Sequence, residues 1–227
     1  MTSESPGGGG PDVPGHVVAV LGGTGDEGRG LARRLSMAGH QVIIGSRKAE
    51  RAAAAAAELG GGLLTGAENR DAAGAADVVI ASVPWEGHRD LLAALAEPLA
   101  GKVVIDCVNP MGFDSHGAYA LRVPEGSAAE QAAAVLPDST VVGAFHHVPA
   151  GLLLDPAVAT VDMDVLVLGD KRAATDLVIA LASEIPGMRG IYGGRLRNCG
   201  QVEALTANLV SINRRYSAHA GIRITDV

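Results

Sequence analysis

The stretch Val17–Gly28, which reads VVAVLGGTGDEG, joins a short apolar run directly to a cluster of glycines. An apolar run of this length, bounded by glycine, is typical of a strand that is buried on both faces of a parallel sheet. Gly23, Gly25 and Gly28 form the pattern G-x-G-x-x-G, which cradles the pyrophosphate of a dinucleotide when it joins a strand to a helix. We expect Gly23 to permit the tight turn, Gly25 to let the pyrophosphate approach, and Gly28 to let the helix pack on the strand.

Strands and helices alternate along the chain outward from this turn. After the first strand the sequence predicts, in order, helix 29–38, strand 41–44, helix 49–59, strand 77–83, helix 87–100, strand 102–106, helix 127–136, strands 140–145 and 164–168, helix 173–185 and a long helix from 201 to about 220. This alternation predicts an α/β fold with a Rossmann-type doubly wound, mainly parallel sheet and a small C-terminal extension that ends in a long helix.

Composition divides the chain into three parts. Residues 1–16 are mostly Gly, Pro and Ser with almost nothing to bury, which predicts a disordered tail. Residues 17–145 form the predicted dinucleotide-binding domain, and residues 146–227 form a C-terminal part. The last helix carries an apolar stripe suited to a core or a subunit interface. Because the chain is short for a dehydrogenase with its own substrate domain, we expect a homodimer that closes the site.

Charge and composition argue against several classes of protein. With 25 Asp and Glu against 18 Lys and Arg, the formal charge is −7, which disfavours general nucleic-acid binding. No apolar run approaches the roughly 20 residues of a membrane span, and the N-terminus does not have the pattern of a signal peptide. The two cysteines, Cys107 and Cys199, indicate reduced thiols and therefore a cytoplasmic location.

The end of the second predicted strand distinguishes NADP from NAD. An NAD site usually has Asp or Glu about 20 residues after the glycines, where it binds the ribose 2′-hydroxyl. Here the chain has Ser46 and Arg47, with Arg51 one helical turn further on. A hydroxyl and guanidinium groups bind a 2′-phosphate that a carboxylate would repel, so NADP(H) is the predicted cofactor. Asp26 and Glu27 lie awkwardly near a pyrophosphate, and their side chains are expected to point to solvent.

The sequence shows no obvious protein acid for hydride-transfer chemistry. None of the three tyrosines has a lysine four residues later, which excludes the mechanism of the short-chain dehydrogenases. No His/Cys cluster has metal-ligand spacing, so no metal is predicted. His146 and His147 are adjacent, so on a strand their side chains would point apart. The reaction either needs no protein acid or uses one of the histidines, for which His146 is the candidate.

Several motifs together resemble one enzyme family. They are Gly22-Gly23-Thr24-Gly25, Gly45-Ser46-Arg47, Val83-Pro84-Trp85-Glu86, Asn109-Pro110, Ser127-Ala128-Ala129-Glu130, AFHHVPA at 144–150, and Val202-Glu203-Ala204-Leu205-Thr206. From Val17 to about Ile224, in this order, the chain resembles the NADP-dependent oxidoreductases of the deazaflavin coenzyme F420. The resemblance implies reversible hydride transfer between NADP(H) and coenzyme F420, which would be the small-molecule partners of the protein.

The resemblance also implies roles for particular residues. Backbone amides around 109–112 and 148–151 would stabilise charge that develops on the deazaflavin, with His146 as a possible donor and thus the candidate catalytic residue. Arg195 and Arg197 are candidates for binding the acidic tail of the coenzyme. The predicted cofactor-binding residues are Gly23, Thr24, Gly25, Asp26, Glu27, Gly28, Ser46, Arg47, Arg51, Val83, Pro84, Trp85, Asn109, Pro110, Pro149 and Ala150. Two alternatives stay open: an NADPH-dependent reductase of a small imine or ketone, and a non-catalytic NADP-sensing module.

Overall fold

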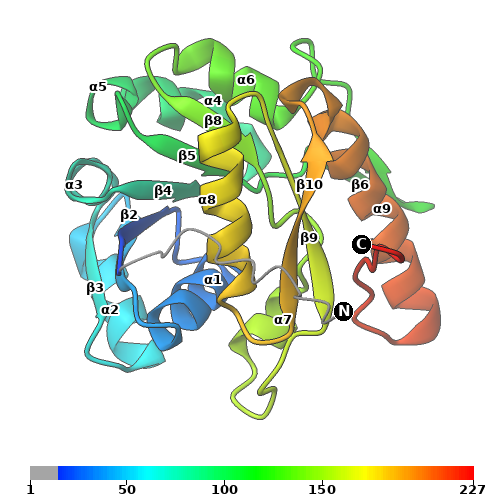
Figure 1. The fold of residues 1–227 in the computed structure, drawn as a ribbon, viewed down its shortest axis with the longest axis horizontal. Coiled ribbons are helices and arrows are strands. Elements are labelled where there is room, and N and C mark those ends of the chain that lie inside the picture. Colours follow the sequence, from blue (N-terminus) through cyan, green and yellow to red (C-terminus); the bar gives the residue numbers. More distant parts are fainter. Residues whose placement is uncertain (1–14) are drawn as a thin grey trace, which may run out of the picture.

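The protein is described by a computed structural model that covers residues 15–227 (Figure 1). Residues 1–14 of the predicted tail lie outside the described part of the chain. The described part is built around one eight-stranded sheet with the strand order β10-β9-β8-β5-β4-β1-β2-β3. The strands are β1 (Val17–Leu21), β2 (Gln41–Ser46), β3 (Leu64–Glu68), β4 (Val78–Ala81), β5 (Val103–Asp106), β8 (Thr140–Gly143), β9 (Met163–Gly169) and β10 (Met188–Gly194).

The direction of the strands confirms the predicted mainly parallel, doubly wound sheet. The six strands from β3 to β8 are parallel, in the order of a Rossmann fold. Strand β9 pairs with β8 in the antiparallel sense, and β10 pairs with β9 in parallel, so the C-terminal part continues the same sheet. A separate antiparallel hairpin is formed by β6 (Met111–Asp114) and β7 (Gly117–Ala120).

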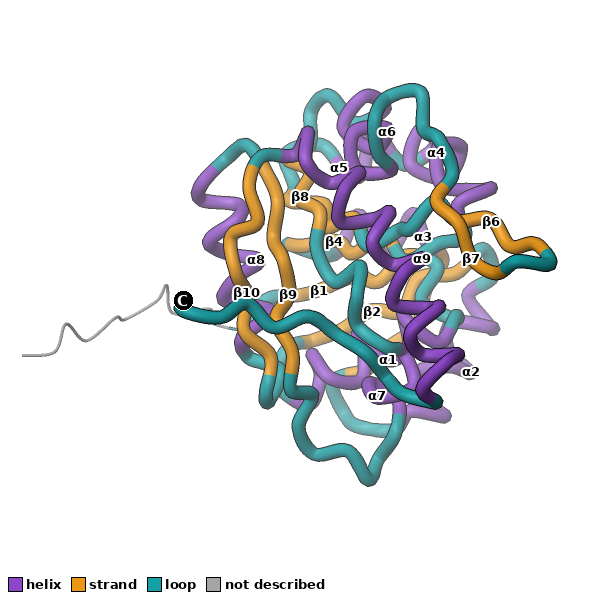
Figure 2. Tube along the Cα trace, turned by 90° about the vertical axis from the view of Figure 1, so that its right-hand side faces the viewer, coloured by secondary structure: helices purple, strands orange, loops and turns teal. Residues whose placement is uncertain are grey.

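Helices cover both faces of the sheet (Figure 1). One face packs against α1 (Asp26–Met37), α2 (Ala49–Leu59), α7 (Ala150–Leu154) and α8 (Arg172–Ser183). The other packs against α3 (Asn69–Ala75), α4 (Trp85–Ala94), α5 (Ala96–Leu99), α6 (Ala128–Val135) and α9 (Cys199–Tyr216), which is preceded by a short 3₁₀ turn at Leu196–Asn198. In Figure 2 the long helix α9 runs beside the β6–β7 hairpin. None of the helices among residues 15–227 is long and apolar enough to cross a membrane.

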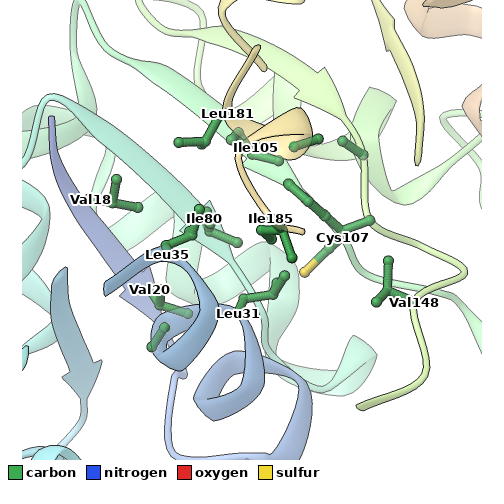
Figure 3. Packing of buried hydrophobic residues seen from close by; sticks show 14 of the residues in the cluster. Val18, Val20, Leu31, Leu35, Ile80, Ile105, Cys107, Val148, Leu181 and Ile185 are labelled. Carbon is green, nitrogen blue, oxygen red and sulfur yellow. The ribbon is translucent and has the colours of Figure 1, made fainter. Parts of the chain in front are cut away.

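The apolar run of β1 supplies both cores because strand side chains alternate between faces. Val18 and Val20 pack with Leu31 of α1 in one core (Figure 3). Ala19 and Leu21 belong to the opposite core, under α3 to α6. All four of these strand side chains are fully buried. This explains why the strand is a continuous apolar run instead of an alternating one.

Several elements differ from the prediction. Helix α1 begins at Asp26 and not at Arg29, so it includes both acidic residues of the glycine turn. Strand β8 ends at Gly143 and not at Phe145, because Phe145 takes a left-handed backbone conformation with φ of 65°. The predicted strand 77–83 is shorter, at Val78–Ala81. The elements β3, α3, the β6–β7 hairpin, α7 and β10 were not predicted, because their sequences are short or rich in glycine and tertiary pairing decides their structure.

Candidate active site

A cleft of about 850 Å³ opens at the carboxyl ends of β1, β2 and β4. This is the edge of a doubly wound sheet where ligands bind. The cleft is lined by Gly22, Thr24, Gly25, Asp26, Glu27, Ser46, Arg47, Arg51, Asn69, Ser82, Val83, Pro84, Glu86, Gly87 and Leu91. The structure therefore brings together most of the residues that the sequence assigns to the NADP(H) site.

The roles of the individual glycines in the turn differ in part from those predicted. Gly22 takes the left-handed conformation, with φ of 66°, so Gly22 and not Gly23 permits the tight turn. A Cβ atom on Gly23 would lie 2.6 Å from the Val20 carbonyl oxygen, and one on Gly28 would lie 2.7 Å from the Cα of Gly23. Both glycines allow close packing, as predicted for Gly28. A Cβ on Gly25 would meet only the Gly22 oxygen, at 4.0 Å, so the protein itself leaves this position open.

The cationic end of the cleft lies at the start of α2. Ser46 is buried at the end of β2, while Arg47 and Arg51 are exposed. Within the described part of the chain, neither arginine forms an ion pair with an acidic side chain. Lys48 precedes α2 without a side-chain cap, so the first amides of this helix are also available to an anion. The arrangement suits a phosphate group.

Asn69 is a cleft residue that the sequence did not reveal. Its Oδ1 accepts a hydrogen bond of 3.3 Å from the amide of Gly22. A Cβ on Gly45 would lie 2.7 Å from the same oxygen, so Gly45 makes room for Asn69. Asn69 follows β3, and because β3 was not predicted, no local signal placed this side chain near the glycine turn.

The two acidic residues of the turn behave differently. Asp26 is exposed, as expected. The expectation for Glu27 is wrong: it is half-buried, in the neighbourhood of the Cys107 thiol and the Asp106 carboxylate. Burial, and secondarily the negative charge of Asp106, raise the pKa of Glu27 to about 8, although the contact with Cys107 opposes this. A glutamate at this position is therefore protonated near neutral pH.

A buried polar chain lies behind the cleft and was not apparent from the sequence. His88 Nε2 and Asp106 Oδ2 are 2.6 Å apart, and both side chains are fully buried. The other ring nitrogen of His88 lies 3.0 Å from Gln131 Oε1, and Gln131 donates to Glu125. Burial alone would lower the pKa of His88, but the hydrogen bond and charge of Asp106, with the bond to Gln131, raise it above its usual value. The pair is consistent with imidazolium and carboxylate.

Trp85, the single tryptophan, lies at the start of α4 next to the cleft residues Pro84 and Glu86. Its ring is stacked on that of His88, with the centroids 5.7 Å apart. Trp85 is half-buried and is not itself among the residues that line the cleft. The buried histidine thus supports the aromatic side chain at the entrance to α4.

A second group of predicted residues is gathered between β5, β8 and α9. Asn109 Nδ2 donates a hydrogen bond of 2.9 Å to the carbonyl of His146, and Thr206 donates one of 3.0 Å to Asn109 Oδ1. Pro110 is buried. Pro149 and Ala150 are half-buried at the start of α7. This group lies outside the residues that line the 850 Å³ cleft.

The two adjacent histidines lie in a turn after β8. Their ring centroids are 6.4 Å apart and tilted by 56°. His147 donates a hydrogen bond of 2.6 Å from Nε2 to the Val202 carbonyl. Both ring nitrogens of His146 are buried without a hydrogen-bond partner, and burial lowers the pKa of His146 to about 4. His146 is therefore neutral near pH 7, and it can donate or accept a hydrogen bond but cannot supply a positive charge.

The two arginines considered for the coenzyme tail, Arg195 and Arg197, lie between β10 and α9. Arg195 forms a hydrogen bond of 3.0 Å with the Asp170 carbonyl and lines a separate pocket of about 440 Å³ with Arg172 and Tyr192. Arg197 is exposed in the 3₁₀ turn before α9.

Comparison with known proteins places the chain in a family. Residues 17–110 match the family model described as NADP oxidoreductase coenzyme F420-dependent. An F420-dependent NADP reductase of Methanothermobacter marburgensis is 42% identical over 221 residues, which is 92% of this chain and 98% of the relative. One from Methanocaldococcus jannaschii is 40% identical over 92% of this chain and 98% of the relative.

A solved structure agrees with these relatives. The crystal structure of a protein from Arthrobacter sp. FB24, described as a putative F420-dependent NADP reductase, is 29% identical and superposes with a TM-score of 0.79. The match covers 93% of this chain and all of that structure. Identity at this level, over nearly the whole length of the relatives, shows that the chain belongs to the F420-dependent NADP reductase family of oxidoreductases.

Proposed function

We infer that the protein is an enzyme that transfers a hydride reversibly between NADP(H) and coenzyme F420. The observation that carries this inference is the cleft itself. It combines an open glycine turn at the start of α1 with two arginines, Arg47 and Arg51, that are free of acidic partners at the start of α2. Family membership identifies the second cofactor, because the relatives that cover the chain are named for F420.

The roles of the cleft residues follow from their positions. Thr24 and the amides of the first turn of α1 would bind the pyrophosphate, since Gly25 leaves this approach open. Ser46 and Arg47 would bind the 2′-phosphate through charge-assisted hydrogen bonds, with Arg51 beside them. Val83, Pro84 and the neighbouring Trp85 would border the nicotinamide end. When bound, the nicotinamide and the deazaflavin supply the hydride chemistry, and the protein holds their reacting faces together.

The deazaflavin is assigned to the group around Asn109 and His146. Two segments form this group: the loop with Asn109 and Pro110, and the loop that leads through Pro149 into α7 at Ala150. Hydrogen bonds among Asn109, Thr206 and the His146 carbonyl join these segments. Backbone amides of these loops would stabilise the negative charge that develops on the deazaflavin, and the neutral imidazole of His146 would donate a hydrogen bond. In this proposal residues 17–145 bind NADP(H), and residues 146–227 complete the deazaflavin site.

The direct test mixes the protein, NADPH and oxidised F420. The visible absorbance of the deazaflavin is expected to disappear as it is reduced, and NADH in place of NADPH should support a much slower change. If folded protein that binds NADP leaves the absorbance of F420 unchanged, hydride transfer to this coenzyme is not its activity.

Replacement of Arg47 by alanine is expected to weaken NADPH binding by about 1–3 kcal/mol, as for loss of a charge-assisted contact, and to leave NADH binding nearly unchanged. Titration of each reduced cofactor, followed by its fluorescence, measures both affinities. Arg70→Ala is a matched control, because Arg70 is an exposed arginine on α3 that pairs with Glu97 at 2.9 Å. An equal loss for NADPH and NADH would contradict the assignment of the 2′-phosphate.

We also propose a homodimer in the cytoplasm. Exposed apolar side chains gather on the β6–β7 hairpin and α9, which lie side by side in Figure 2; they are Phe113, Tyr119, Leu205, Ile212 and Tyr216. This surface is the candidate interface, and sedimentation at several protein concentrations would measure the assembly. The location rests on the two cysteines, which are free and buried thiols.

A further inference from the structure

Glu27 occupies an unusual position for an acidic residue at a phosphate-binding turn. It is the second residue of α1, and it lines the cleft together with Thr24 and Gly25, where the proposed function places the pyrophosphate. An acidic residue in the first turn of a helix is normally an exposed anion that interacts favourably with the helix dipole, as its neighbour Asp26 is. Glu27 is instead half-buried in the wall of the cleft, near Asp106 at the end of β5 and Cys107 just after it.

No cation pairs with Glu27 in the described part of the chain. The two free arginines of the same cleft, Arg47 and Arg51, lie at the start of α2, and the proposed function assigns them to the 2′-phosphate. On the same helix, Arg29 is bound to Glu58 at 2.8 Å. The charged group that acts on Glu27 from β5 is Asp106, whose Oδ2 lies 2.6 Å from His88 Nε2. Among residues 15–227, Glu27 forms no ion pair with a lysine, arginine or histidine.

Apart from these two arginines, the side chains considered around Glu27 are acidic or neutral. Asp26 of α1 and Glu86 of α4 line the same cleft and carry the same sign of charge as an ionised Glu27. Ser82, which follows β4, and Cys107, which follows β5, are neutral. An ionised Glu27 would therefore face two protein carboxylates and the pyrophosphate with no cation paired to it, whereas a protonated one can donate a hydrogen bond.

We propose that Glu27 contacts the bound dinucleotide as a neutral carboxylic acid that donates a hydrogen bond to it, so that binding of NADP(H) retains a proton on this side chain. The inference rests on the proposed function only in placing NADP(H) in this cleft. In support, burial raises the pKa of Glu27 to about 8 in the protein alone, so the group is already protonated at neutral pH. An added pyrophosphate favours the neutral form further.

The consequence is a defined dependence of NADP⁺ affinity on pH. Below about pH 8 the donor is in place, and the dissociation constant is expected to stay constant. Above that pH the proton must be taken up on binding, so the dissociation constant should rise by up to about tenfold for each pH unit. The number of protons bound per NADP⁺ should approach one over the same range.

The experiment is calorimetric titration with NADP⁺ between about pH 6.5 and about pH 9.5, in buffers that differ in ionisation enthalpy, on the full chain and two variants. Glu27→Gln keeps the size and a donor but cannot ionise, so its affinity should stay within about threefold of the low-pH value of the unmodified protein and remain constant with pH. Asp26→Asn removes the exposed acid of the same turn. Its affinity for NADP⁺ should differ from that of the unmodified protein by the same factor at every pH, and the uptake of a proton above about pH 8 should remain.

Two results would overturn the proposal. One is an unmodified protein whose affinity is constant to about pH 9.5 with no proton uptake; this measurement needs no variant and stands even if Glu27→Gln fails to fold. The other is a Glu27→Gln variant whose affinity falls with pH in parallel with that of the unmodified protein. Failure of the unmodified protein to bind NADP⁺ at any pH would contradict the proposed function itself, which is a different and distinguishable outcome.

Discussion

Replacement of His88 by alanine is expected to lower the free energy of unfolding by about 3–5 kcal/mol. His88 and Asp106 are both fully buried and 2.6 Å apart, so removal of the imidazole leaves the Asp106 carboxylate buried without its counterion. Asp106 keeps only a 3.1 Å hydrogen bond from the Val108 amide. The variant also removes the ring on which Trp85 is stacked. Denaturation by urea, followed by circular dichroism, measures the loss without relying on the fluorescence of Trp85.

The neighbouring residue offers a matched control. Arg89 forms an ion pair with Glu125 at 2.5 Å, but more than half of its side chain is exposed. Loss of an exposed pair of this kind costs about 0–1 kcal/mol, so Arg89→Ala should be close to the unmodified protein. Similar stabilities for the two variants would show that the His88–Asp106 pair contributes little.

The pH dependence of stability gives an independent check on His88. Because the pKa of His88 is raised in the folded state, its contribution is complete below the ordinary value of 6.5 and is lost as the pH rises through the folded-state pKa. Glu27 and Glu203 act in the same direction, since burial raises the pKa of Glu27 to about 8 and that of Glu203 to about 7. The protein should therefore lose stability from about pH 6 to about pH 9, and His88→Ala should lose less over this range.

Features of the fold and of the cleft that depend on short contiguous stretches of sequence were predicted. The residues predicted from the glycine spacing and those predicted from Ser46 and Arg47 line one cleft at the carboxyl ends of the strands. The apolar run of β1 predicted a sheet covered on both faces. Each of these inferences depends on a contiguous stretch of fewer than about ten residues, within which spacing in sequence determines spacing in the fold.

The parts that were missed depend on contacts between distant segments. Asn69 reaches Gly22 across 47 positions of sequence, and only the register of the unpredicted β3 brings it there. Glu27 was expected to be solvated because helix starts favour exposed acids, but the end of β5 places Cys107 and Asp106 against it. The pair of His88 and Asp106 joins the middle of a helix to the end of a strand, so neither residue has a local signal.

Arg34 of α1 is the basis of the second large prediction. Although it is an arginine, Arg34 is only 1% exposed. Its guanidinium donates to the carbonyls of Leu153 at 2.9 Å, Leu152 at 2.7 Å and Val158 at 2.8 Å. These carbonyls belong to the last turn of α7 and the loop after it, to which Arg33 adds one further bond of 3.2 Å at Leu153. The Arg34 side chain therefore makes most of the side-chain hydrogen bonds that hold this segment to α1.

Replacement of Arg34 by methionine, which keeps the apolar stem, is expected to cost about 3–5 kcal/mol of unfolding free energy because several buried carbonyls lose their donor at once. Arg33→Met is the control: Arg33 is half-buried and makes one 3.2 Å bond to the Leu153 carbonyl, so its loss should cost about 1 kcal/mol or less. Chemical denaturation measures both.

The Arg34→Met substitution is also expected to affect the two proposed cofactor sites differently. Helix α7 begins at Ala150, directly after the proline assigned to the deazaflavin site. The glycine turn lies at the opposite end of α1 from Arg34, and the hydrogen bonds of the Arg34 guanidinium go to carbonyls of residues 152–159 and not to this turn or to Arg47. At a temperature where Arg34→Met is still folded, its KM for F420 should rise several-fold while its affinity for NADP⁺ stays within about twofold, because only the segment that follows Pro149 has lost its anchor. An equal loss for both cofactors would mean that α7 supports the whole cleft, and the assignment of residues 146–227 to the deazaflavin site would then have to be abandoned.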